Sequence, residues 1–166
     1  DNLGTSDAPF KTIEKAIDSV PIGGYGTIRL QPSEYVLTSN ILVVDKFLVI
    51  RGDTSSPSDY IITHTVYGTD NYCYTLQIVN SVITFIGCGL KTYSGTVDSD
   101  HHATSLLGRH NESGFGLVTL YSCNVELNDA DLVSISYGGG TLDVSLTSSD
   151  VVVNTTEGKL LRIEDG

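Results

Sequence analysis

A recurring triplet of apolar, polar and apolar residues constrains the fold of this chain more than any other feature of its sequence. The clearest copy is Ile83-Thr84-Phe85. The other copies have the same pattern and are Ile28-Arg29-Leu30, Leu48-Val49-Ile50, Val118-Thr119-Leu120 and Val144-Ser145-Leu146. Alternation of this kind predicts β-strands, because successive side chains of a strand point to opposite faces.

The last three copies match beyond the triplet as well. Residues of the same class follow the triplet at equal intervals, first Cys88, Cys123 and Ser149, then Leu90, Val125 and Val151. The copies begin 20, 35, 35 and 26 residues apart, a range typical of solenoid repeats. Constant strands joined by loops of variable length predict an all-β parallel β-helix, in which equivalent residues of successive turns stack on one another. A β-sandwich is the alternative, although it does not require equivalent positions to keep their residue class.

An amphipathic segment near the N-terminus predicts one α-helix, over residues 7–20. Asp7 or Ser6 is suited to cap it, Pro9 fits its first turn, and Pro21 with the glycines after it ends it. We expect residues 1–24 to form a loop and a helix that covers the first end of the β-helix, and residues 25–166 to form its turns. The abrupt end at residues 165–166 predicts a fragment of a longer β-helix, because solenoid ends normally carry a cap.

Composition excludes several classes of protein. The 166 residues contain 20 acidic and 9 basic side chains, for a net charge of −11, which repels nucleic acid and anionic membranes. The sequence has no run of about 18 apolar residues, so we expect no membrane insertion. Of the three cysteines, Cys88 and Cys123 occupy equivalent repeat positions. This predicts stacked buried thiols rather than a disulfide framework or a metal site.

The N-terminal third of the chain resembles the opening of pectate-lyase-superfamily β-helix proteins. The resemblance is carried by residues 9–17 (PFKTIEKAI), residues 26–30 (GTIRL), Glu34-Tyr35 and residues 48–53 (LVIRGD). That superfamily includes bacteriophage tailspikes, pectin methylesterases and other polysaccharide-active proteins. The resemblance implies a right-handed single-stranded parallel β-helix with an N-terminal capping α-helix.

Two enzyme branches of the superfamily are disfavoured residue by residue. The Gln-Asp pair and the Asp-Phe-Ile-Phe-Gly-like run of pectin methylesterases are absent, and Leu107-Gly108-Arg109 is followed by His110-Asn111 rather than by Pro-Trp. Nothing in the sequence marks the acidic calcium site and arginine base of pectate lyases. Tailspikes share no active-site motif, so their branch stays open.

Candidate catalytic residues gather between positions 91 and 114. Carboxylates there stand beside His101, His102 and His110, and a pair of carboxylates is what glycosidic bond hydrolysis requires. The predicted catalytic pair is Asp98 or Asp100 together with Glu112 or with Glu126, which lies beyond this segment. The alternative is a solvated loop with incidental histidines. Adjacent His101 and His102 would point to opposite faces of an extended chain, so we expect no metal and no other cofactor.

Tyrosines on loops suggest contacts with sugars, because a tyrosine ring offers a flat apolar face and a polar edge. With nearby polar residues they form the predicted carbohydrate-binding set: Tyr60, Tyr67, Tyr72, His101, Arg109 and His110. The alternative is that the tyrosines pack their loop onto the coil or fill a subunit contact.

The resemblance to this superfamily implies a homotrimeric, phage tailspike-like protein of the virion tail. It would bind and degrade a bacterial surface polysaccharide, such as capsule, lipopolysaccharide or exopolysaccharide. The alternatives are a non-catalytic adhesin or structural stem, and a secreted pectin-active enzyme. The alternative location is secreted or on the cell surface.

Overall fold

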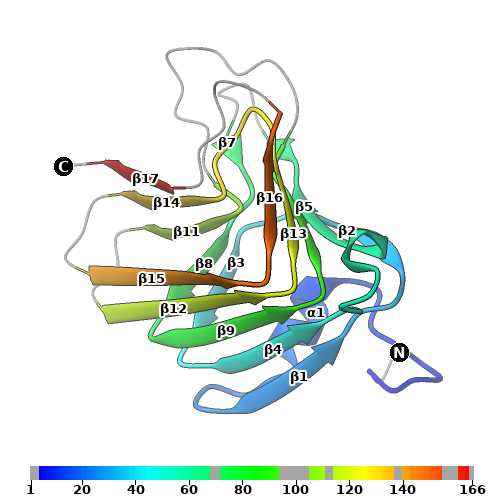
Figure 1. Cartoon of the computed structure of the whole chain (residues 1–166). Helices are drawn as coiled ribbons and strands as arrows, with labels where there is room; N and C mark the ends of the chain where they lie inside the picture. The colour runs from blue at the N-terminus through cyan, green and yellow to red at the C-terminus, as the bar shows by residue number, and fades with distance from the viewer. Residues whose placement is uncertain are drawn as a thin grey trace.

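The computed structural model describes residues 4–67, 72–93, 105–110, 114–136, 140–154 and 161–164. For residues 66–67, 72–73, 109–110, 134–136, 140 and 161–164 it describes the backbone alone. The described chain is mostly β-strand, arranged in parallel sheets (Figure 1). The all-β prediction is therefore confirmed.

Fifteen strands form three five-stranded sheets, here named A, B and C. Sheet A contains β1 (Tyr25–Arg29), β4 (Phe47–Arg51), β9 (Ser81–Ile86), β12 (Gly114–Tyr121) and β15 (Gly140–Thr147). Sheet B contains β2 (Ser33–Leu37), β5 (Tyr60–His64), β10 (Gly89–Lys91), β13 (Asn124–Leu127) and β16 (Asp150–Val153). Sheet C contains β3 (Ile41–Val44), β8 (Leu76–Val79), β11 (Leu107–His110), β14 (Val133–Ser136) and β17 (Leu161–Glu164).

The chain visits the three sheets in turn, and each pass through A, B and C adds one strand to every sheet. The second pass also carries the 3₁₀ turn η1 (Pro57–Asp59) and an antiparallel pair, β6 (Val66–Tyr67) with β7 (Tyr72–Cys73). All pairings within sheets A, B and C are parallel. The sandwich alternative is wrong, because the sheets of a sandwich are antiparallel.

Four of the five triplets stack in the predicted register. Ile83 pairs with Leu48 on one side and with Val118 on the other, and Val118 pairs with Val144. The first triplet is out of this register by two residues. Alignment of the triplets would pair Ile28 with Leu48, but Ile28 pairs with Ile50. That register places Gly26 beside Leu48.

Helix packing explains the displaced register of β1. A Cβ atom on Gly26 would collide with the side chain of Val20, which follows α1. Glycine therefore stands where later strands carry an apolar side chain, because a residue outside the sheet already fills that space. The displacement of two residues preserves the alternation, so Arg29 still faces outward.

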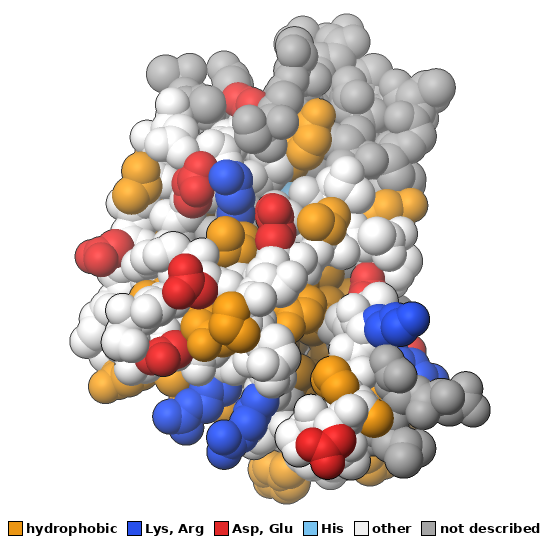
Figure 2. All heavy atoms as spheres, turned by 90° about the vertical axis from the view of Figure 1, so that its right-hand side faces the viewer, with side chains coloured by type: hydrophobic (Ala, Val, Ile, Leu, Met, Phe, Trp, Pro, Cys, Tyr) orange, Lys and Arg blue, Asp and Glu red, His pale blue; other side chains and the backbone are white. Residues whose placement is uncertain are grey.

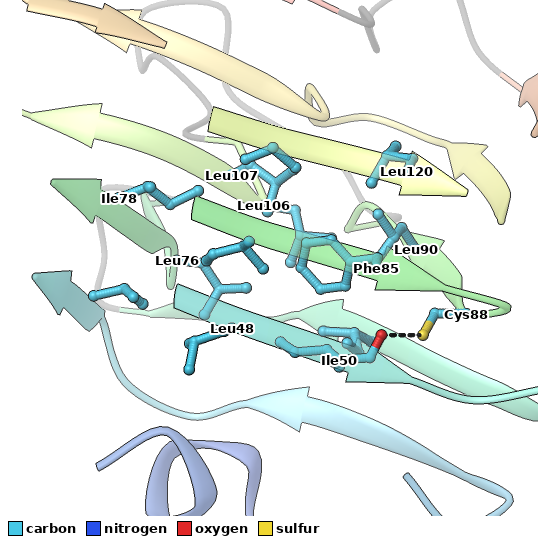
Figure 3. Close-up of a cluster of buried hydrophobic side chains, with 14 of the residues drawn as sticks. Leu48, Ile50, Leu76, Ile78, Phe85, Cys88, Leu90, Leu106, Leu107 and Leu120 are labelled. Atoms are coloured by element: carbon cyan, nitrogen blue, oxygen red, sulfur yellow. Dashed lines mark hydrogen bonds between the residues drawn. The ribbon is translucent and has the colours of Figure 1, made fainter. Parts of the chain in front are cut away.

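Apolar residues of the three sheets meet in one shared core. Side chains of Phe85 and Leu120 from sheet A, Leu90 from sheet B and Leu107 from sheet C point into the same space (Figure 3). The exposed fractions of these side chains are 0–1%. Complete burial of such a side chain contributes about 1.5–3 kcal/mol to the free energy of unfolding.

Hydroxyl and thiol groups stabilise the corner between sheets A and B. Cys88 Sγ donates to Ile50 O (Figure 3). Cys123 Sγ donates to Phe85 O and Ser149 Oγ to Leu120 O, so each of the three bonds a carbonyl of the preceding pass. Both cysteines are free and buried, which confirms the predicted stack of thiols. Burial raises the pKa of Cys88 to about 12 and also raises that of Cys123.

The helix α1 (Ile13–Asp18) is shorter than predicted. Its N-cap is Thr12, whose Oγ1 accepts from Lys15 N at 3.2 Å, and not Asp7 or Ser6. The preceding residues form a separate turn, in which Gly4 N donates to Ala8 O at 2.9 Å.

The apolar face of α1 packs at the first-pass end of the sheets (Figure 1). Ile13 and Ile17 are 2% and 0% exposed and belong to the shared core. Near the helix C-terminus, Lys46 Nζ donates to Ile17 O at 2.8 Å. A cation there adds a second hydrogen bond to a carbonyl that also accepts from Val20 N at 3.1 Å, and it complements the helix dipole.

Candidate functional site

A groove of about 470 Å³ lies on the outer face of sheet B. It is lined by residues of η1, four strands of sheet B and the segment after β16: Ser58, Ile61, Gly89, Leu90, Lys91, Asn124, Val125, Glu126, Asp150, Val152 and Asn154. Figure 2 views the side of the molecule that carries sheet B, and on it a basic side chain lies between acidic ones.

Strand register sets the polar residues of the groove in two outward-facing columns. Asn124 and Asp150 are paired in one column. Lys91 and Glu126 are paired in the other. Gly89 precedes Asn124 in the first column, and a Cβ atom there would lie 3.1 Å from Ile61 Cγ1 and 3.2 Å from Pro57 O. The absence of a side chain at Gly89 therefore keeps the floor of the groove low.

Glu126 is held in place by two donors. Its Oε1 lies 3.3 Å from Lys91 Nζ and accepts a 3.0 Å hydrogen bond from Asn154 Nδ2. The side chains of Lys91 and Glu126 are 36% and 43% exposed. An ion pair this exposed adds at most about 1 kcal/mol to stability, so its main effect is to orient the carboxylate.

A chain of amide contacts extends from this carboxylate into the protein. Asn154 Nδ2 also contacts Asn128 Oδ1 at 3.0 Å, and Asn128 Nδ2 donates to Thr92 O at 3.0 Å. The backbone N–H of Asn128 donates to Thr92 Oγ1 at 2.8 Å. Asn128 and Thr92 are 6% and 0% exposed, so the groove rests on an ordered polar support.

Two carboxylates face the groove, Glu126 and Asp150. Asp150 pairs with Asn124, two residues before Glu126 on the neighbouring strand. Standard strand spacings place the Cα atoms of such diagonal neighbours about 8 Å apart. The sequence analysis missed Asp150, although the predicted alignment of Ser149 with Cys123 already placed Asp150 beside Asn124.

Glu126 is the one predicted catalytic residue whose side chain is described. Asp98, Asp100 and Glu112 lie outside the described residues, so the predicted pairing of Glu126 with one of the first two stays a prediction.

Among the predicted sugar-binding residues, Tyr60 alone has a described side chain. Its ring packs against the hydrophobic core, which is the packing role left open as the alternative. Tyr67 and Tyr72 pair across β6 and β7, and Arg109 and His110 lie in β11, in each case with the backbone alone described. His101 lies outside the described residues.

A second polar cluster, which the sequence did not predict, lies inside the protein. His64 is 3% exposed, and neither of its ring nitrogens forms a hydrogen bond of standard geometry with the described residues. Burial lowers the pKa of His64 to about 4, and backbone groups of Tyr74 and Ser105 offset only part of this effect. Nearby, Thr75 Oγ1 donates to Ser105 O at 2.7 Å. His64 is therefore a neutral interior residue at pH 7, and it does not line the groove.

Within the described part of the chain, no three His, Cys, Asp or Glu residues are grouped to hold a metal ion. The described helices also include none long and apolar enough to cross a bilayer.

Comparison of the chain with protein-family models, with curated proteins and with solved structures found no match.

Proposed function

We propose that the chain is a right-handed, single-stranded parallel β-helix, with residues 1–24 as its N-terminal loop and cap and residues 25–166 as its turns. The support is the order in which the chain visits sheets A, B and C. A closed tube would bury the apolar triplet residues and leave the alternate side chains of each sheet for recognition.

We further propose that this tube is a tailspike-like module that binds a bacterial surface polysaccharide. The groove on sheet B is the observation that carries this proposal. It combines an apolar contribution from Ile61 and Val152 with hydrogen-bonding groups of Asn124, Asn154 and Glu126. A sugar ring has apolar faces and polar edges, so a groove of this mixed character suits it.

Degradation of the polysaccharide is proposed to depend on Glu126 and Asp150. Inverting glycosidases place two carboxyl groups about 6.5–9.5 Å apart, which leaves room for a water molecule between the sugar and the base. The diagonal placement of Glu126 and Asp150 is compatible with that spacing. The contacts of Glu126 with Lys91 and Asn154 would fix the carboxylate relative to a bound sugar.

A non-catalytic adhesin or stem is the second candidate. It is favoured by one observation, that Glu126 Oε1 already interacts with both Lys91 and Asn154. A carboxylate engaged in this way can also serve as a fixed acceptor for sugar hydroxyls. Assembly into a homotrimer and location on the virion tail belong to both versions of the proposal. Val151 and Val153, which are 39% and 57% exposed on β16, are apolar surface that a neighbouring subunit would cover.

The test is to incubate the intact protein with a panel of purified capsules and lipopolysaccharides and to measure glycan length. Shortening by the wild type that is lost in E126Q and in D150N supports hydrolysis in the groove. Retention without shortening, weakened by the same substitutions, supports an adhesin. E34Q is the matched control, because Glu34 is exposed on the same sheet but does not line the groove. A protein that neither retains nor shortens any glycan is a stem, and the binding proposal is then wrong.

A further inference from the structure

The outer face of sheet A carries a second ordered surface, distinct from the groove. One outward column crosses all five strands and is here named the arginine column: Arg29, Arg51, Ile86, Tyr121 and Thr147. Its members occupy equivalent positions of successive strands, so they lie about 4.8 Å apart along the stack. The column is a straight row of side chains on a rigid sheet.

Arg29 and Arg51 are directly paired on neighbouring strands, and both are exposed. Like charges placed opposite each other destabilise a sheet. Neither arginine forms a salt bridge within the described residues, where the ion pair is Lys91–Glu126. Among the described residues, the two guanidinium groups therefore carry positive charge that no salt bridge neutralises, in a protein of net charge −11.

Asp53 is the acidic group that acts on Arg51. Its Oδ1 accepts from Ser55 N at 2.8 Å and from Ser55 Oγ at 2.7 Å. These bonds, followed by a smaller effect of Arg51, lower the pKa of Asp53 below its usual range. Asp53 forms no salt bridge with Arg51 among the described residues, so it offsets the charge of Arg51 only in part. No described acid forms an ion pair with Arg29.

We propose that the arginine column binds an acidic polysaccharide, with a carboxylate of the glycan on Arg29 and Arg51. The guanidinium group matches a carboxylate in a planar, two-point contact. The next sugar along the stack would lie on Ile86 and Tyr121, and the Tyr121 side chain is 46% exposed. This inference rests on the proposed function in taking a glycan as the ligand, and it adds the chemical class of that glycan.

Charge complementarity selects this occupant over two others. Binding to nucleic acid depends on neutralising many closely spaced phosphates, and two arginines on an acidic protein do not provide that. In a two-fold contact between copies at this column, Arg29 and Arg51 would face the same arginines of the second copy, and like charges opposite each other oppose association there. A polysaccharide with one carboxylate per repeating unit requires one such pair of cations.

The test is to measure binding of hyaluronan and alginate oligosaccharides to the full chain by calorimetry. The same oligosaccharides with methyl-esterified carboxylates serve as uncharged ligands. We expect the free acids to bind and the esters not to bind. The double variant R29Q/R51Q should raise the Kd by at least about tenfold, because it removes two charge-assisted hydrogen-bonding groups. R29K/R51K should fall between it and the wild type, because lysine keeps the charge without the planar fork.

The matched control is K11Q/K15Q, which removes the same charge from two exposed lysines at α1. It should leave the Kd unchanged. Equal weakening by both double variants would show a general charge effect and overturn the proposal, as would failure of the wild type to bind any free acid. Tighter binding of an oligothymidylate, or self-association that R29Q/R51Q abolishes, would assign the surface to nucleic acid or to a second copy instead. E126Q and D150N should leave binding at the arginine column intact, which separates this test from that of the groove.

Discussion

His64 makes the stability of the fold depend on pH in a way that the geometry predicts. The residue is buried on the inner side of β5, in register with Leu37, and its pKa is lowered to about 4 from the ordinary value of 6.5. The unfolded chain therefore takes up the proton at a higher pH than the folded protein does. The contribution of neutral His64 is complete above about pH 6.5 and is lost as the pH falls through about 4.

The size of the effect follows from the two pKa values. A difference of one pKa unit corresponds to about 1.4 kcal/mol, so the full loss is about 3 kcal/mol, of which about 2 kcal/mol has occurred at pH 5. Replacement by leucine removes the titrating group and matches the residue to its apolar neighbour. The H64L variant should equal or exceed the wild type at pH 7.5 and exceed it by at least about 2 kcal/mol at pH 5.

Urea denaturation of both proteins at pH 7.5, 6 and 5 measures this difference. Each protein has the same remaining histidines and carboxylates, so their titration cancels in the comparison. A difference between H64L and the wild type that stays constant with pH would refute the reasoning, because it would mean that His64 has the same pKa in both states.

Three other expected outcomes test the core, the corner and the thiols. F85A should lower the free energy of unfolding by about 3–5 kcal/mol, because Phe85 is fully buried. T84A, on the opposite face of β9, should lower it by less than about 1 kcal/mol. Similar losses for the two variants would contradict the assigned faces of the strand. Gly87 has φ of +59°, and a Cβ atom there would collide with the backbone of Asp53. G87A should therefore lower the melting temperature of the protein measurably. An unchanged melting temperature would refute the geometry of this corner. Cys88 and Cys123 should resist alkylation at pH 8 in the native protein and react in urea, because burial raises both pKa values. Mass spectrometry identifies the alkylated cysteine. Rapid alkylation of either cysteine in the native protein would show that this cysteine is not buried.

The stacking of the triplets was predictable because two independent features of the sequence indicate it. The period of two identifies strands, and the constant interval from each triplet to Cys88 or Cys123 aligns one pass with the next. That alignment succeeds because parallel neighbours in register place like residues together. The same alignment already placed Asp150 beside Asn124, although Asp150 does not stand out in the sequence because it lies outside the segment richest in acidic and histidine residues.

The displaced register of β1 was not predictable, because it depends on a tertiary contact between Gly26 and Val20. The short helix has a similar cause. Residues 4–8 satisfy their backbone groups in a turn of their own, so Thr12 and not Asp7 begins the helix. The burial of His64 was also missed. The sequence around His64 is rich in tyrosine and threonine, which predicts a surface position. Its burial follows only from its neighbours on the adjacent strands.

The central claim is that the triplet residues stack one above another in successive passes. Methyl-labelled NMR spectroscopy tests it directly, because nuclear Overhauser effects report only on protons a few ångströms apart. We expect cross-peaks that link Leu48 to Ile83, Ile83 to Val118 and Val118 to Val144. Absence of this series in a spectrum where the four methyl groups are assigned would contradict the register, and with it the groove and the arginine column.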